Sequence, residues 1–117
     1  MESDGDRYMA WLLRDGEVLA SVEIASSLAA RSRGLLGKRH FEGALLLRRT
    51  RSVHTIGMRI AIDVAFLSKD LQVIGTTTML PYRVALPRRG VRSVLEAEAG
   101  AFERWKLVPG DGLEIKG

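Results

Sequence analysis

The sequence predicts a mainly β (α+β) fold: a small antiparallel β-sandwich or open β-barrel with one or two short helices. Short apolar segments rich in β-branched residues recur along the chain, and turn signals separate them. The regular strand–helix alternation of a doubly wound parallel sheet is absent. At 117 residues the chain is expected to form one domain over residues 1–117, with residues 1–7 as a disordered tail.

The predicted elements follow one another through short connections. Asp15-Gly16 lies between two apolar runs and favours a tight hairpin turn over residues 8–24, because both turn positions can adopt a positive φ. A segment starting after Ser26 or Ser27 has apolar residues at helical spacing. The remaining segments predict strands at 44–47, 60–67, 72–78, 94–97 and 113–115, and helices at 28–37 and 101–105.

Composition excludes several classes of protein. There is no cysteine, which rules out disulfides, thiolate zinc sites and a cysteine nucleophile. No apolar run approaches the roughly 20 residues that a membrane helix needs. The first residues are acidic and polar, unlike a signal peptide. A cytoplasmic protein without a membrane partner is therefore expected.

Positive charge is concentrated in the middle of the chain. Residues 31–60 contain eight Lys or Arg and one acidic residue, and arginines cluster at 48–51 and again at 83–92. Such clusters can bind a small anionic ligand or a nucleic-acid backbone. Tyr82 is the only aromatic neighbour for base stacking, so a nucleic-acid partner is not expected, and solvated loops are the simplest interpretation.

Two carboxylates lie within apolar strands, where a charge is costly unless it is paired. Asp63 stands in the middle of the segment Ile62–Leu67, and Glu96 follows Val94-Leu95. Asp63 is either a structural anchor that accepts backbone hydrogen bonds or a member of a ligand site. The anchor is the simpler interpretation.

His54, Thr55 and Met58 precede the Asp63 strand. A histidine near neutral pH can move protons, so His54 with Asp63 or Glu96 gives an alternative function as a small hydrolase or lyase. Nothing in the sequence shows that these groups meet, and a packed histidine is the simpler interpretation. No spacing typical of a metal site is present, and neither a metal nor a cofactor is expected.

Several segments carry a resemblance to a known family. They are similar, in order and spacing, to the blocks of the DUF192 family (domain of unknown function 192), and they are Arg31–Lys38, Gly43–Leu47, Val53–Met58, Ile62–Leu67, Val94–Gly100 and Pro109–Asp111. Leu36 stands where that family usually has Met, and Gly57 where an aromatic residue often precedes Met58. The resemblance implies a small β-rich barrel or sandwich with short helices and no established enzymatic activity.

These observations favour a non-catalytic small-ligand-binding or accessory module over an enzyme. A small anionic ligand is the expected partner, and the protein is expected to be a monomer or a weak oligomer. The weak binding of nucleic acid or anions through the arginine clusters is a further alternative. The predicted binding residues are His54, Thr55, Met58, Asp63 and Glu96, with Arg33 or Arg88 as the anion partner.

Overall fold

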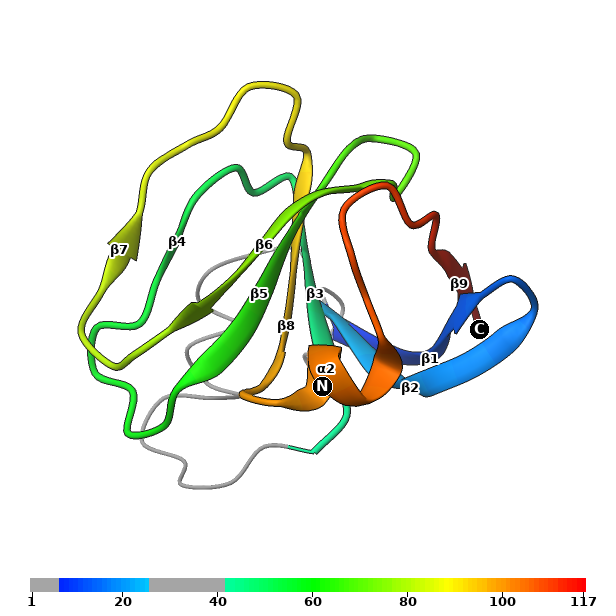
Figure 1. Cartoon of the computed structure of the whole chain (residues 1–117), viewed down its shortest axis with the longest axis horizontal. Helices are drawn as coiled ribbons and strands as arrows, with labels where there is room; N and C mark the ends of the chain where they lie inside the picture. The colour runs from blue at the N-terminus through cyan, green and yellow to red at the C-terminus, as the bar shows by residue number, and fades with distance from the viewer. Residues whose placement is uncertain (1–6, 26–41) are drawn as a thin grey trace.

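The computed structural model describes residues 7–25 and 42–117 (Figure 1). The helix predicted over 28–37 and the predicted tail, apart from Arg7, lie outside the described residues. The described elements are β1 (Arg7–Arg14), β2 (Glu17–Ala25), β3 (Ala44–Arg48), β4 (Val53–His54), β5 (Ile62–Leu67), β6 (Val73–Met79), β7 (Val84–Ala85), β8 (Ser93–Glu98), α2 (Ala101–Trp105) and β9 (Glu114–Lys116).

Seven of the strands form one mixed sheet in the order β6-β5-β8-β3-β2-β1-β9. Its pairs are antiparallel except for β2 with β3, which run parallel. The edge strands do not pair along their length, but Gln72 bridges Gly112 at one end, and the Val73 N–H donates to the Asp111 carbonyl at 2.8 Å. The prediction of a mainly β, α+β domain is confirmed, and the sheet is open rather than a closed barrel.

The N-terminal hairpin has the turn that the sequence predicts. Asp15 and Gly16 have φ of 53° and 80°, so both occupy the left-handed region that this tight turn requires. β1 pairs with β2 from Arg7↔Ala25 to Arg14↔Glu17, with an irregularity between Leu12 and Leu13. In the sheet, β2 of the hairpin lies next to β3, and β1 lies between β2 and β9.

The sheet is apolar on both faces. On the first face, side chains such as Leu46, Ala65 and Leu95 form a core that α2 covers. On the second face, side chains such as Val64 and Val94 form a separate core. Adjacent residues of a strand point to opposite faces, which explains why the central strands are apolar without interruption.

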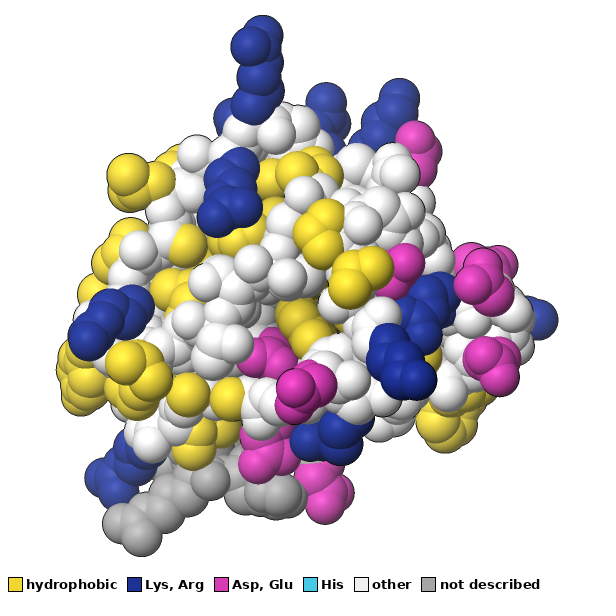
Figure 2. Space-filling view, in the orientation of Figure 1, with side chains coloured by type: hydrophobic (Ala, Val, Ile, Leu, Met, Phe, Trp, Pro, Cys, Tyr) yellow, Lys and Arg dark blue, Asp and Glu magenta, His cyan; other side chains and the backbone are white. Residues whose placement is uncertain are grey.

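A two-stranded sheet of β4 and β7 stands beside the second face, and we call residues 53–58 with 80–86 the arm (Figure 1). Val53 and Ala85 pack against the second core, whereas other apolar side chains of the arm are exposed. Figure 2 shows hydrophobic side chains gathered over this side of the molecule. The sequence predicted only a loop over 81–90, because a two-residue strand between prolines gives no periodic signal. The exposed apolar residues of the arm are Ile56, Leu80, Tyr82, Val84 and Leu86.

Candidate functional site

Asp63 is an anchor at the first face of the sheet. Its side chain is 4% exposed and accepts three hydrogen bonds. Thr78 Oγ1 donates to Oδ1 at 2.7 Å, and the backbone N–H groups of Gly100 and Phe102 donate to Oδ2 at 3.0 and 3.1 Å. Gly100 and Phe102 lie at the N-terminus of α2, where N–H groups have no partner within the helix. Asp63 therefore caps α2 from a strand 37 residues earlier in the chain.

Thr55 joins the two segments of the arm, 53–58 and 80–86. It is fully buried, its Oγ1 donates to the Leu80 carbonyl at 2.6 Å, and the Arg83 N–H donates to Oγ1 at 2.8 Å. Its backbone N–H donates to the Arg83 carbonyl, and its carbonyl accepts from Tyr82 and Met58. Every polar group of Thr55 is thus used within the fold.

His54 and Met58 flank this connection. His54 pairs with Val84 across the arm, and its Nδ1 accepts a hydrogen bond from the Ile56 N–H at 3.3 Å. Met58 is buried in the second core. His54, Thr55 and Met58 therefore lie together, as their spacing in the sequence requires.

Glu96 lies on the opposite face of the sheet from Asp63. It is 0% exposed and stands opposite Leu45 and Val64, both members of the second core. Ala97, the next residue, stands opposite Asp63 and belongs to the first core. The two carboxylates of the hydrolase or lyase alternative are therefore separated by the sheet, and Glu96 with His54 remains as the pair for that alternative.

Arg88 packs on an aromatic ring. Its guanidinium carbon lies 4.3 Å from the ring centroid of Phe66, a buried residue of the second core. A Cβ on Gly75, the neighbour of Phe66 in β6, would come within 2.7 Å of Arg88 Nη1. Arg88 thus covers the Phe66 ring, and Gly75 has no side chain that would collide with the guanidinium. Arg33, the other predicted anion partner, lies outside the described residues.

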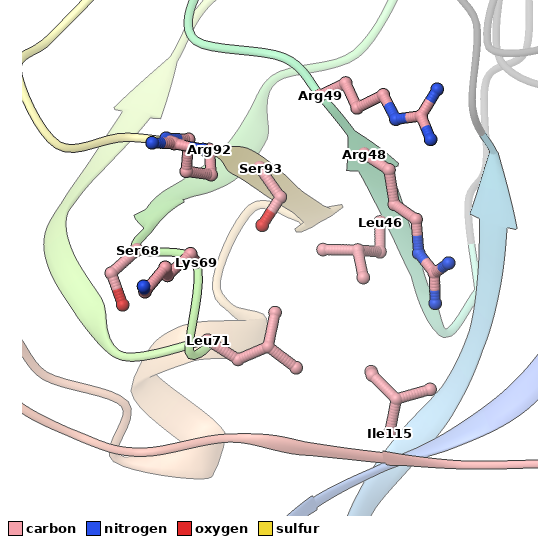
Figure 3. Close-up of a pocket in the computed structure, with 9 residues that line it drawn as sticks. All are labelled: Leu46, Arg48, Arg49, Ser68, Lys69, Leu71, Arg92, Ser93 and Ile115. Carbon is pink, nitrogen blue, oxygen red and sulfur yellow. The ribbon is translucent and has the colours of Figure 1, made fainter.

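A pocket of about 350 Å³ opens on the first face, between the sheet, the β5–β6 turn and β9 (Figure 3). Ser93 lies in its wall, and four of its lining residues are cationic. No carboxylate is found among its lining residues within the described part of the chain. We call it the Ser93 pocket, and its lining residues are Leu46, Arg48, Arg49, Ser68, Lys69, Leu71, Arg92, Ser93 and Ile115.

Ser93 is the unusual residue of this pocket. It is 5% exposed, and its Oγ has no hydrogen-bond partner among the described residues. The register places Ser93 opposite Arg48 of β3 on one side and Leu67 of β5 on the other. Figure 3 shows the Oγ pointing into the pocket. A buried hydroxyl without a partner is costly and uncommon in folded proteins, and ligand sites are one place where it occurs.

The cations around Ser93 come from separate segments of the chain. Arg48 ends β3 and Arg49 follows it, Lys69 lies in the β5–β6 turn, and Arg92 precedes β8 (Figure 3). Arg48 donates to the Tyr8 hydroxyl at 2.7 Å and lies over the Tyr8 ring. In the described ranges, Arg49, Lys69 and Arg92 form no ion pair with a carboxylate. Within residues 7–25 and 42–117, the pocket therefore concentrates positive charge that no ion pair of Arg49, Lys69 or Arg92 compensates.

Comparison with known proteins identifies the family. The model of the family DUF192, described as Uncharacterized ACR, COG1430, matches residues 10–115. The chain belongs to the DUF192 family. It is 32% identical over 103 residues to a UPF0127 protein of Pyrococcus furiosus, an alignment that covers 84% of this chain and 89% of that protein. It is 33% identical over 98 residues to a UPF0127 protein of Pyrococcus horikoshii, covering 80% and 85% of the two chains.

Two solved structures have a fold similar to that of this chain. A crystal structure from Sinorhizobium meliloti, described as a "putative transcription regulator", has a TM-score of 0.75 and 25% identity, and covers 93% of each chain. A protein of unknown function from Novosphingobium aromaticivorans has a TM-score of 0.72 and 22% identity, and covers 92% of this chain and 84% of its own. The match of the family model over residues 10–115 confirms the family resemblance in the sequence.

Sequence reasoning found only part of the Ser93 pocket in this DUF192 chain. The two arginine clusters contained Arg48, Arg49 and Arg92, but Ser93 and Lys69 were not selected. A signal for Ser93 was present: it alternates with Leu95 and Ala97 on the apolar face of β8, so a hydroxyl there had to be buried.

Within 7–25 and 42–117, no group of three His, Asp or Glu side chains gathers to hold a metal ion. No described helix has the length and apolar character needed to cross a membrane.

Proposed function

We propose that this DUF192 protein is a non-catalytic binding module for a small anion, and that the anion lies in the Ser93 pocket. The observation that carries the proposal is the buried Ser93 Oγ, which has no partner among the described residues and lies in a pocket whose lining includes four cationic residues. A bound oxyanion would accept the Ser93 hydrogen bond, which removes the cost of leaving that donor unmade. It would also reduce the repulsion between the cations.

The chemistry of the lining supports binding rather than catalysis. Arginine holds its charge at any physiological pH and presents several donors to an oxyanion, but it does not move protons. The pocket contains no histidine or carboxylate, the usual general acids and bases. Its volume of about 350 Å³ lies at the lower end of the range for small-molecule sites.

Isothermal titration of inorganic phosphate into the protein tests this proposal, with sodium chloride matching the ionic strength. We expect saturable binding that Ser93→Ala weakens at least tenfold, because the variant removes a hydrogen bond to a charged ligand. Arg92→Gln should weaken it as well. Arg89→Gln is the matched control, since Arg89 is an exposed arginine nearby that does not line the pocket. The absence of saturable binding, or an equal loss in Arg89→Gln, would overturn the proposal.

Nucleic-acid binding is the second candidate, and one observation favours it. The two arginine clusters meet, because Arg48 and Arg49 line the same pocket as Arg92, and the Thr50 N–H donates to the Arg92 carbonyl at 3.2 Å. The description of the similar Sinorhizobium meliloti protein is consistent with it. Fluorescence anisotropy with duplex DNA separates the candidates. Nucleic-acid binding would weaken steeply with salt and would not respond to Ser93→Ala.

We further propose the cytoplasm as the location of the protein, which a cysteine-free sequence supports. A monomer or weak oligomer is the proposed assembly, and sedimentation measurements over a range of concentrations test it.

A further inference from the structure

The Ser93 pocket has two chemically different sides. Its polar side comprises Ser93 and the cationic residues, and its apolar wall comprises Leu46, Leu71 and Ile115, with Leu46 between Ser93 and Arg48 (Figure 3). These three residues belong to or pack against the first core, so their positions are set by the fold. A hydrated inorganic ion would use the polar side alone and leave the apolar wall in contact with water.

The backbone at Leu71 supports a role for the apolar wall. Leu71 has a φ of 64°, in the left-handed region where Gly and Asn are favoured and a bulky residue is uncommon. Hydrogen bonds hold the turn in this conformation: the Leu71 N–H donates to the Ser68 carbonyl at 3.0 Å, and the Leu113 N–H donates to the Leu71 carbonyl at 3.0 Å. Leucine thus contributes apolar surface at a position where the backbone alone favours another residue.

A second residue of the pocket shares this conformation. Arg49 has a φ of 56°, and it lies on the side of the pocket formed by the end of β3. Non-glycine residues in the left-handed region are found often at ligand sites, where the surrounding structure maintains the strain. The polar and the apolar side of the Ser93 pocket therefore each contain one such residue.

From these observations we infer that the natural ligand is an amphiphilic phosphate monoester, with a dianionic phosphate at Ser93 and a short apolar substituent against Leu71 and Ile115. This inference rests on the proposed function and specifies its ligand class. Four cations with no carboxylate in the lining favour a dianion over a monocarboxylate. The apolar wall selects an ester over free phosphate, because burying its substituent removes apolar surface from water.

Titration of inorganic phosphate and of n-butyl phosphate into the same protein tests the inference. We expect butyl phosphate to bind about tenfold more tightly, as partial burial of a four-carbon chain predicts. Leu71→Asn is the informative variant, since asparagine accepts the left-handed conformation and removes the apolar surface. It should leave the phosphate affinity within about twofold and reduce the butyl advantage below about threefold.

A second variant guards against an effect on the turn. Ile115→Thr keeps the β-branched shape on β9 and makes the same wall more polar, so it should also reduce the butyl advantage. Binding of phosphate with equal binding of butyl phosphate would overturn the inference and leave the proposed function intact. Binding of neither would overturn both. An equal loss of both ligands in Leu71→Asn and Ile115→Thr would also overturn the inference.

Vesicles containing phosphatidic acid distinguish the source of the phosphate monoester. A soluble ester requires that butyl phosphate binds and that the vesicles do not retain the protein. Retention that Ser93→Ala abolishes would instead assign the phosphate to a lipid headgroup.

Discussion

Asp63 and Ser93 are both polar residues buried on the first face of the same sheet, yet their surroundings differ. Asp63 accepts hydrogen bonds from Thr78, Gly100 and Phe102, so the fold satisfies both of its oxygens. Ser93 Oγ has no partner among the described residues. Burial alone therefore does not identify a functional group. A polar group that the fold satisfies contributes to stability, and one that the fold leaves unsatisfied is available to a ligand.

The largest expected effect is the loss of the Asp63 carboxylate. Asp63→Ala leaves the N–H groups of Gly100 and Phe102 without an acceptor at the N-terminus of α2, and should lower the free energy of unfolding by about 3 kcal/mol. Urea denaturation measures it. Asp63→Asn keeps an acceptor and the size of the side chain, so it should cost about 1 kcal/mol and leave phosphate affinity unchanged. A loss of phosphate affinity in Asp63→Asn with normal stability would place Asp63 in the site instead.

The sequence predicts that Asp63 is buried in its strand and that its charge needs hydrogen-bond donors, but it does not identify those donors. Alternation along β5 identifies the residue as buried, and a buried carboxylate requires donors. The donors come from residues 100 and 102, which the chain brings back only because β8 pairs with β5 and leads into α2. Such contacts depend on the topology of the sheet, which a single sequence does not specify.

The contacts of the other predicted site residues also depend on how the chain folds back on itself. His54, Thr55 and Met58 attracted attention as a polar segment before an apolar strand, whereas the structure uses Thr55 to bind Leu80 and Arg83, 25 and 28 residues later. The Ser93 pocket requires the ends of β3 and β8 to pair, and the β5–β6 turn and β9 to approach them. The arginine clusters were evident in the sequence, but their meeting was not.

Thr55 is a buried polar residue of the arm, beside the second face, and its hydroxyl is hydrogen-bonded within the fold. Thr55→Val preserves the shape of the side chain but removes the donor to Leu80 and the acceptor for Arg83, and it should cost about 2 kcal/mol. Chemical denaturation monitored by circular dichroism gives the value. Thr76→Val is the matched control, because it makes the same substitution in β6 at a residue whose Oγ1 forms no hydrogen bond within the described residues. Equal losses in the two variants would show that the hydrogen bonds of Thr55 contribute nothing.

Arg88 is a cation that packs on an aromatic ring, and its contribution to stability can be measured. Arg88→Ala removes a guanidinium from above the Phe66 ring and should lower the free energy of unfolding by about 1 kcal/mol. Arg89→Ala is the control, since the next arginine is exposed and makes no such contact. Thermal unfolding of both variants provides the comparison. A smaller loss for Arg88→Ala than for Arg89→Ala would contradict the packing role.

The smallest expected loss of stability is at Ser93, where the contrast with Asp63 is tested most directly. Ser93→Ala removes a buried hydroxyl that has no partner in the described part of the chain, and with it the cost of leaving that group unpaired, so the free energy of unfolding should not fall and should rise by up to about 1 kcal/mol. Thr78→Val also removes one hydroxyl on the first face, but that hydroxyl donates to Asp63, and its loss should cost about 1 kcal/mol.

Urea denaturation without phosphate, then with saturating phosphate, completes this test. Phosphate should stabilise Thr78→Val as much as the unmodified protein, because Thr78 does not line the Ser93 pocket. It should stabilise Ser93→Ala less, because the variant binds the anion more weakly. A loss above about 1.5 kcal/mol in Ser93→Ala without phosphate would mean that the hydroxyl serves the fold, and the difference between the two buried groups would disappear.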